Sequence, residues 1–365
     1  MADAALEQKD TATKQENFSI HCSQGYTSWL ASVGGSLVVT TYQVGKILFL
    51  GLNDEEKFTL FDRTFPRAMG VGFSENSEKF MLATKMQIYE FDNLLAANQR
   101  AGAFDKFYGP HKSWITGDLD IHDLEIGADG LPIFVNTRFN CISTVAEGHS
   151  FKPIWKPGFI SKIAAEDRCH LNGMVMQGGK PKYVTAVSKS DVLNGWRDRR
   201  VDGGLLIDVE TNEIVLEGLS MPHSPRIHEG KLWVLNSGRG EFGWVDLDNK
   251  EFNPITFCPG FARGLTFAGN YAIIGISEPR EGKTFDGLHL QTALKEKDAK
   301  AWCGLQIVDL STGDIVEWVR IEGLIRELFD VQFLSDVKNP AAIGLAGEEI
   351  NRMVSIAPNQ SSDFG

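Results

Sequence analysis

The stretch MPHSPRIHEGKLWVLNSGRGEFGWVD, residues 221–246, holds the repeating pattern that decides the fold. It opens on a polar segment around His223, turns at Glu229 and Gly230, and continues as an apolar run over 232–236. A short polar loop then leads to a second apolar run. Short runs rich in aromatic and β-branched residues, separated by Gly and Asn turns, are typical of antiparallel strands. The stretch therefore predicts consecutive strands of one small sheet.

The same arrangement recurs along the chain. Seven segments match the run at 232–236, and each is followed by a further strand-like run. These segments begin at Leu37, Phe80, Leu131, Tyr183, Leu232, Tyr271 and Ala342. Units of four short strands, repeated at roughly 40–50 residues, are typical of β-propellers. We therefore predict an all-β protein, a single β-propeller of about seven four-stranded blades around a central channel.

The two ends of the chain differ from the repeats. Residues 1–16 are polar and charged and predict a disordered leader, the propeller is expected over 17–358, and 359–365 predict a flexible tail. The last unit has no obvious fourth strand after a third one at Met353. Phe18 to His21 are expected to supply it and close the ring, because an open ring would leave unpaired strand edges.

Composition limits the classes of partner. The chain has 365 residues, 42% of them hydrophobic, which is enough for a substantial core. A net charge of −12 argues against nucleic-acid binding, which needs a basic surface. No apolar run approaches the ~20 residues of a membrane span. The five scattered cysteines favour reduced thiols and therefore a cytoplasmic protein. The sequence leaves the oligomeric state open.

The first strand of each unit opens with a polar or charged residue, followed by small and apolar ones. The openers are Arg67, His122, His170, His223, Arg263 and Glu327. Equivalent positions on the innermost strands lie at one level of a propeller, so we expect these residues to form a ring at one mouth of the channel. The loops after the second strands reach the same mouth. The longest segments there, 93–117, 188–202 and 277–302, are predicted to act as lids.

The three histidines of this ring predict a metal site. Imidazole is the commonest metal ligand, and His122, His170 and His223 would leave an open position for catalysis. Glu327 is predicted as a fourth ligand or general base, and Asp123 as a second proton-transfer group. Zn²⁺ suits nitrogen ligands best, with Mn²⁺ or Fe²⁺ as alternatives. The competing interpretation is that each histidine caps its own inner strand or bonds a neighbouring carbonyl.

Arginines near the ring predict an anionic substrate. Those at or beside the openers and in the neighbouring loops are Arg67, Arg226, Arg263, Arg138 and Arg280. Guanidinium groups pair bidentately with carboxylates and phosphates, so a small carboxylate- or phosphate-bearing molecule is expected. The alternative is that these arginines form structural salt bridges with nearby acidic residues.

Several motifs resemble a known family. Glu-Asp-Arg-Cys-His-Leu-Asn-Gly at 166–173 and Met-Pro-His-Ser-Pro-Arg at 221–226 resemble a family of bacterial conserved hypothetical proteins of β-propeller type. This resemblance implies the fold and no activity. More distantly, the plan is similar to metal-centred propellers such as the gluconolactonase/senescence-marker group and the oligogalacturonate lyases. The histidine-rich set is closer to the lyases.

These observations lead to one main hypothesis of function and two alternatives. The main hypothesis is a metal-dependent enzyme, of lyase, isomerase or hydrolase type, that acts on a small anionic organic substrate at the channel mouth. One alternative is a non-catalytic propeller that binds a ligand or a protein partner. The other is a metal-free enzyme that uses the histidines as acid and base.

Overall fold

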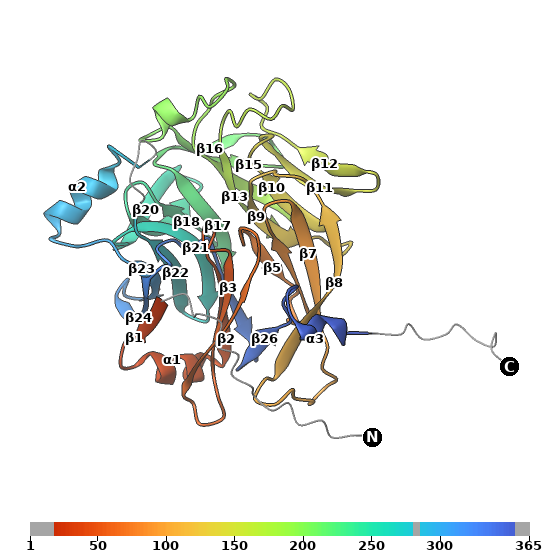
Figure 1. Ribbon diagram of the computed structural model, residues 1–365. Coiled ribbons are helices and arrows are strands. Elements are labelled where there is room, and N and C mark those ends of the chain that lie inside the picture. Colours follow the sequence, from red (N-terminus) through yellow and green to blue (C-terminus); the bar gives the residue numbers. More distant parts are fainter. Residues whose placement is uncertain (1–17, 280–284, 355–365) are drawn as a thin grey trace.

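The computed structural model describes residues 18–279 and 285–354. The predicted leader, 1–16, and the predicted tail, 359–365, lie outside the described residues. The described part forms six sheets, almost entirely antiparallel, arranged as blades around a central channel (Figure 1). The fold is therefore all-β and a propeller, as the repeats predict, but with six blades instead of seven.

Six inner strands line the channel, one from each blade. They are β25 (Asp330–Ser335), β5 (Val71–Phe73), β9 (Ile121–Ile126), β13 (Leu171–Gln177), β17 (Pro222–His228) and β21 (Phe261–Ala268). Each contacts the next, and β25 contacts β5, so that the ring closes. We number the blades 1 to 6 in this order.

The remaining strands of each blade follow outward from the channel. Blade 1 continues with β2 (Gly35–Thr40), β3 (Lys46–Leu52) and β4 (Phe58–Thr64), and blade 2 with β6 (Lys79–Ala83), β7 (Gln87–Asn93) and β8 (Lys106–Ile115). Blade 3 continues with β10 (Pro132–Asn136), β11 (Cys141–Ala146) and β12 (His149–Trp155), and blade 4 with β14 (Lys180–Ala186), β15 (Gly204–Asp208) and β16 (Ile214–Leu219). Blade 5 continues with β18 (Lys231–Asn236), β19 (Glu241–Asp246) and β20 (Glu251–Phe257), and blade 6 with β22 (Tyr271–Ser277), β23 (Cys303–Asp309) and β24 (Ile315–Gly323).

The blade count differs from the prediction because the two ends of the chain share one blade. Strand β25, near the C-terminus, pairs antiparallel with β2, with Asp330 opposite Thr40 and Ser335 opposite Gly35. In Figure 1 the blue C-terminal strands accordingly lie beside the red N-terminal ones. The first and last units of the sequence repeat are therefore one blade, and joining them closes the ring by hydrogen bonds.

The outer edges also differ from the expectation. The segment at Phe18 forms β1 (Phe18–Cys22), which adds a fifth strand to blade 6 beside β24 and not a fourth strand to a seventh blade. The predicted strand at Ala342 is the short β26 (Pro340–Ala342), which pairs parallel with β8 on blade 2. Of the strand expected at Met353, only Met353 and Val354 are described; they follow a short helix and lie outside any strand.

Neighbouring blades are joined by a repeated side-chain hydrogen bond. A hydroxyl at or just after the end of a second strand donates to a backbone carbonyl at the start of the next blade. The four pairs are Thr40 to Met69 (2.7 Å), Thr137 to Leu171 (2.6 Å), Ser237 to Ala262 (2.6 Å) and Ser277 to Leu328 (3.3 Å). Because these groups are buried, each hydrogen bond takes the place of one that the hydroxyl and the carbonyl would otherwise make with water.

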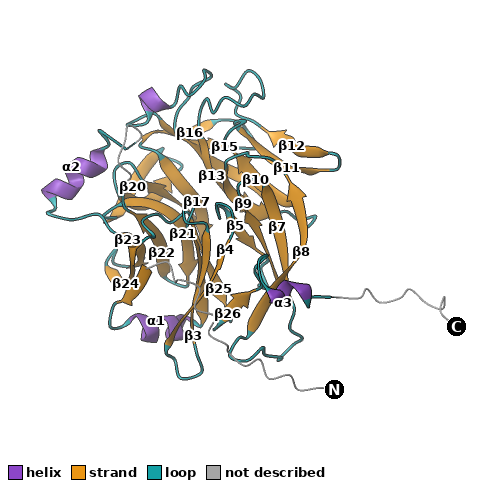
Figure 2. Cartoon of the chain, in the orientation of Figure 1, coloured by secondary structure: helices purple, strands orange, loops and turns teal. Residues whose placement is uncertain are grey.

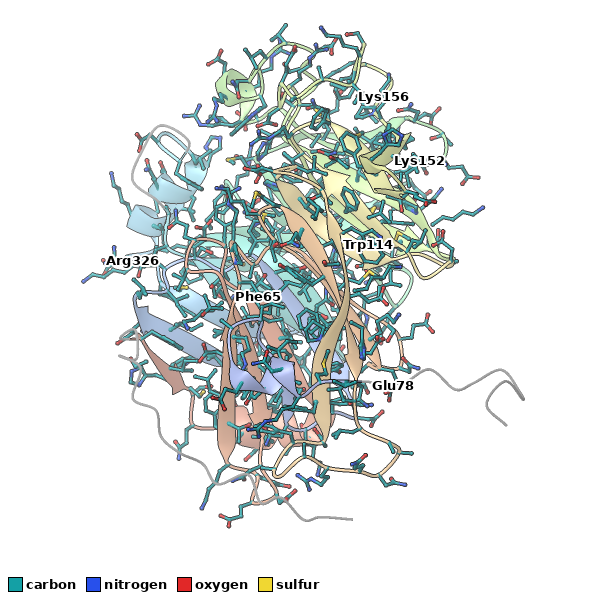
Figure 3. All side chains as sticks on the ribbon, turned by 45° about the vertical axis from the view of Figure 1, so that its right-hand side comes forward. Phe65, Glu78, Trp114, Lys152, Lys156 and Arg326 are labelled. Atoms are coloured by element: carbon teal, nitrogen blue, oxygen red, sulfur yellow. The ribbon has the colours of Figure 1, made fainter. Side chains whose placement is uncertain are left out.

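Apolar side chains fill the space between adjacent sheets, and the stick view in Figure 3 shows this filling, with Trp114 on the outer strand β8. The helices α1 (Tyr26–Val33), α2 (His289–Glu296) and α3 (Glu348–Asn351) and the 3₁₀ turn 197–199 lie at the periphery (Figure 2). No helix within the described ranges is long and apolar enough to cross a membrane.

Candidate active site

His122 and His223 occupy the same position in blades 3 and 5 and are held in the same way. The residue two positions earlier, Asp120 or Met221, has a left-handed backbone, with φ of 52° and 44°. This turn presents a carbonyl to the imidazole, and Nδ1–H donates to it at 2.8 Å in both cases. The Nε2 atom of each ring is therefore the one that carries a free lone pair.

Both of these imidazoles are neutral at pH 7. Burial, followed by the positive charge of Arg263, holds the pKa of His122 and of His223 well below the usual range. A neutral imidazole with Nδ1 engaged is a hydrogen-bond acceptor or a metal ligand at Nε2.

His170, at the entrance of blade 4, is held by a carboxylate and an indole. Its Nδ1 lies 2.9 and 3.0 Å from the two carboxylate oxygens of Asp167. Trp196 stacks on the imidazole, with the ring centroids 4.2 Å apart, and its Nε1–H donates to Asp167 at 2.8 Å. Such a carboxylate fixes the tautomer of the histidine and stabilises the imidazolium that forms when Nε2 takes up a proton.

The rings of His122 and His170 meet edge to face, with centroids 4.9 Å apart. Phe329, which precedes β25, packs against His122 at 5.6 Å, and the guanidinium of Arg263 lies 3.4 Å above the centre of the Phe329 ring. Residues from blades 1, 3, 4 and 6 thus meet at one end of the channel. We call this end, with His122, His170 and His223, the histidine mouth.

Asp120 is an additional acid in this cluster. One of its carboxylate oxygens is buried and has no hydrogen-bond partner within the described chain. Burial raises the pKa of Asp120, and the charges of His170 and Arg263 act against that rise. Asp120 also has a strained left-handed backbone, as do Asp167 and His170, at φ of 42° and 52°. Strain of this kind is concentrated at functional sites.

Two further predicted arginines lie on the rim of the mouth. Arg67 and Arg138 approach the same carboxylate, Asp118, at 3.3 and 3.4 Å. Arg67 also lies 5.2 Å over the ring of Tyr42, which stacks on Phe329 at 5.1 Å. Arg67 and Arg138 therefore form salt bridges, as the alternative interpretation expects, and their role in substrate binding stays a prediction.

The predicted four-ligand metal set is not assembled. Among the residues that the structure describes, no three His, Cys, Asp or Glu side chains are grouped closely enough to hold a metal ion. No hydrogen bond, ion pair or ring contact within these ranges joins Glu327 to a histidine. Glu327 instead lies near Cys303, where burial raises the pKa of the thiol and the charges of Glu278 and Glu327 add to the rise.

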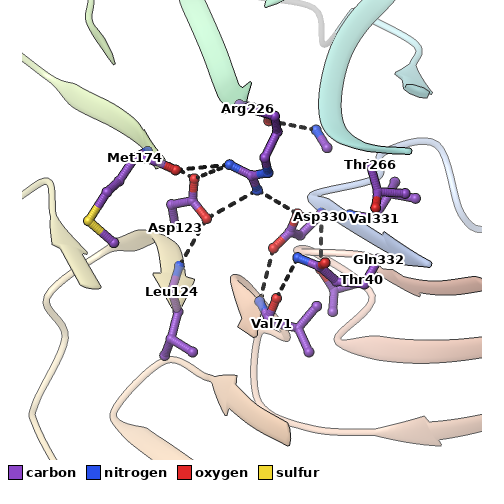
Figure 4. A network of polar contacts seen from close by, with 12 residues as sticks. Thr40, Val71, Asp123, Leu124, Met174, Arg226, Thr266, Asp330, Val331 and Gln332 are labelled. Atoms are coloured by element: carbon purple, nitrogen blue, oxygen red, sulfur yellow. Dashed lines mark hydrogen bonds and ion pairs between the residues drawn. The ribbon is translucent and has the colours of Figure 1, made fainter. Parts of the chain in front are cut away.

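Asp123 and Arg226 belong to a network of polar contacts between inner strands of the propeller (Figure 4). The Arg226 guanidinium pairs with Asp123 at 3.0 Å and with Asp330 at 3.7 Å, and it also donates to the Met174 carbonyl. The Asp123 side chain is only 4% exposed. We call Asp123, Arg226 and Asp330 the channel network. Its members join inner strands of different blades, and the expected catalytic role of Asp123 and substrate role of Arg226 stay predictions.

Two of the three predicted lids reach the mouth. The segment 188–202 places Trp196 on His170 and is anchored by Arg168, which pairs with Glu166 and Asp191, both at 2.6 Å. The segment 277–302 places Phe285 against Phe261, which in turn contacts His223. Its residues 280–284, including the predicted Arg280, are outside the described residues. The third segment, 93–117, contains the ten-residue outer strand β8, which pairs with β7 at the edge of blade 2, and it is not a lid.

Sequence reasoning missed Asp120, Asp167 and Phe329 as members of the site. Asp120 and Asp167 do carry a signal, because each lies two or three residues before an opening histidine, where a short polar side chain tolerates a left-handed turn. Phe329 lies two residues from the predicted Glu327 on the same segment. Trp196 lies on a predicted lid, but nothing in the sequence pairs it with His170.

Residues 24–343 match a protein family described as a domain of unknown function, DUF4915. The chain belongs to this family. The match confirms the expected resemblance to a family without an assigned activity, across most of the chain.

Solved structures that are similar to this DUF4915 protein share little sequence with it. A protein of unknown function from Bacteroides caccae is 10% identical, with a TM-score of 0.47, and the alignment covers 82% of this chain and 98% of that one. Virginiamycin B lyase from Staphylococcus aureus is 11% identical, with a TM-score of 0.39 and coverage of 84% and 99%. No curated protein sequence matches the chain.

Proposed function

We propose that this protein is an enzyme that transfers a proton to or from a small anionic organic molecule at the histidine mouth. The observation on which the proposal rests is the pairing of His170, oriented by Asp167, with the neutral His122 at a centroid distance of 4.9 Å. Because Nδ1 of both imidazoles is already hydrogen-bonded, Nε2 is the ring atom that can exchange a proton with a substrate, which suits general acid–base catalysis.

His170 is the proton-transfer group in this proposal. Its Nε2 lone pair takes a proton from a carbon next to the anionic group of the substrate, and Asp167 stabilises the resulting imidazolium. The electron pair of the broken C–H bond moves into the substrate, where it expels a leaving group or shifts a double bond. These are lyase and isomerase reactions. If Nε2 deprotonates a bound water instead, the outcome is hydrolysis.

Arg263 supplies the positive charge that this chemistry needs. It is 9% exposed, and its charge reaches His122, His223 and Asp120. A cation fixed on the face of Phe329 orients a carboxylate or phosphate and offsets negative charge that develops during the reaction. His122, as a neutral acceptor, binds a substrate hydroxyl or a water.

A metal-assisted version is the second candidate, and one observation favours it. All three histidines direct Nδ1 to a carbonyl or carboxylate, which is how metal-ligating histidines are commonly oriented. His122 and His170 would supply two of the ligands, with zinc as the first choice. Elemental analysis of protein purified without an affinity tag tests this version; less than one metal ion per two chains, unchanged in His170→Gln, rules it out.

Turnover of pooled small carboxylic and phosphorylated acids tests the enzyme itself. We expect wild-type activity that survives chelation and falls by about 10²–10⁴-fold in His170→Gln. His149→Gln, an exposed histidine on β12, is the matched control and should keep full activity. Binding of the acids without turnover would favour a ligand-binding propeller over an enzyme. Equal turnover in His170→Gln would overturn the role assigned to His170.

A further inference from the structure

The face opposite the histidine mouth has a pocket of its own, with a volume of about 710 Å³. Its walls are the turns that end the inner strands of blades 2, 3 and 4, at Ser74 to Asn76, at Gly127 and at Gly178. Strand β9 runs from Ile121 beside the mouth to Ile126 at the pocket. At ~3.3 Å per residue these two ends lie about 16 Å apart, so the pocket is separate from the proposed active site.

Glu125, on β9, reaches this pocket from the channel side. Burial raises the pKa of its carboxyl to about 8, while the charge of Arg226 lowers it and those of Asp123 and Asp330 raise it. Arg226 is engaged by those two aspartates. No hydrogen bond or ion pair of the Glu125 carboxyl occurs with any residue that the structure describes. The pocket therefore ends in an acid that has no direct ion-pair partner among the described residues, since Arg226 acts on it only from a distance.

The other walls favour a cation that carries apolar groups. Glu75 adds a second carboxylate at the rim, and no lysine, arginine or histidine is among the described residues that line the pocket. Phe73 and Met176 supply an aromatic ring and a thioether. Aromatic faces attract ammonium groups, and a partly desolvated carboxylate pairs with them more strongly than one in water. An anion would meet two carboxyl groups and no cation among these lining residues.

We propose that this pocket binds a small organic ammonium ion, with its nitrogen paired to Glu125 and its alkyl part against Phe73 and Met176. The assignment is independent of the proton-transfer function. When the protonated Glu125 binds the cation, its O–H bond breaks and one proton passes to solvent, so that a carboxylate–ammonium pair remains. Binding should therefore release protons below about pH 8 and tighten as the pH rises toward that value.

Calorimetric titration with n-butylammonium tests this site, with 1-butanol and butyrate as neutral and anionic probes of similar shape. We expect the ammonium alone to bind at millimolar concentration, with an enthalpy that depends on the buffer because protons are released. Glu125→Gln keeps the shape of the side chain and removes its charge, and it should weaken binding by roughly 30-fold or more. Unfolding transitions show whether this variant is folded.

His170→Gln serves as the control from the other end of the channel and should bind n-butylammonium as the wild type does. The proposal is overturned if n-butylammonium fails to bind the wild type, if 1-butanol binds equally well, or if Glu125→Gln binds the ammonium unchanged. Loss of binding in His170→Gln would place the ammonium at the histidine mouth and would equally overturn it.

Discussion

Replacement of Arg226 by methionine should destabilise the propeller strongly, because it removes the only cation of the channel network. Methionine keeps an unbranched, largely apolar stem of similar length but leaves Asp123 and Asp330 facing each other. Both carboxylates are 4% exposed and the Arg226 side chain is 11% exposed, so water cannot replace the lost charge.

The expected cost follows from this burial. Breaking a buried, hydrogen-bonded ion pair by removal of one partner costs about 3–5 kcal/mol, against less than about 1 kcal/mol for a solvent-exposed pair. An unfolding entropy of about 2.1 cal/mol/K per residue amounts to roughly 0.7 kcal/mol/K for a domain of this size. The melting temperature should therefore fall by about 4–7 °C.

Urea unfolding followed by fluorescence at pH 8 measures this loss, with Arg326→Met, an exposed arginine, as the matched control that should stay within about 0.5 kcal/mol. Arg226→Met with Asp330→Asn should recover part of the stability, because one unpaired buried charge is gone. A loss below 1 kcal/mol, or a double variant less stable than the single one, would refute the view that this network joins the blades.

Three other predictions concern separate parts of the molecule. Thr137→Val removes the hydroxyl that donates to the Leu171 carbonyl between blades 3 and 4, and it should lower the free energy of unfolding by about 1–2 kcal/mol in the same assay. An unchanged unfolding midpoint would contradict the role of these hydrogen bonds. In ¹⁵N NMR spectra at pH 6, His122 and His223 should remain neutral with the proton on Nδ1, and a protonated ring would show that burial does not dominate. The pKa of Glu125 is raised to about 8 in the folded protein, so its protonated carboxyl contributes fully to stability below about pH 4.3, and this contribution is lost as the pH rises through about 8. Between pH 5 and 8 the free energy of unfolding of the wild type should therefore fall more than that of Glu125→Gln. Parallel pH profiles of the two proteins would contradict this.

The blade architecture was largely predictable, and the sequence even contained the correct count. The six openers from Arg67 to Glu327 mark six inner strands, whereas the seven-fold count came from the second strands. The unit at Leu37 has no opener of its own because its inner strand, β25, comes from the far end of the chain. A pairing between distant segments has no local pattern, so counting repeats alone overestimates the ring by one blade.

The site was predictable in position but not in detail. The openers other than Glu327 do meet at one mouth, yet Arg226, three residues beyond His223 and across a β-bulge, serves a different network. Asp123 follows His122 directly, and neighbouring strand residues point to opposite sides. The left-handed turns at Asp120 and Asp167, which orient the histidines, depend on tertiary packing and leave only a weak local signal.

The most direct test of proton transfer at the histidine mouth compares the turnover of small carboxylic and phosphorylated acids by the wild type, His170→Gln and His149→Gln, each with and without a chelator. We expect turnover by the wild type and His149→Gln that resists the chelator. In His170→Gln, with the fold intact, turnover should fall by at least about 10²-fold. Equal turnover by all three proteins would contradict the assignment of proton transfer to the histidine mouth.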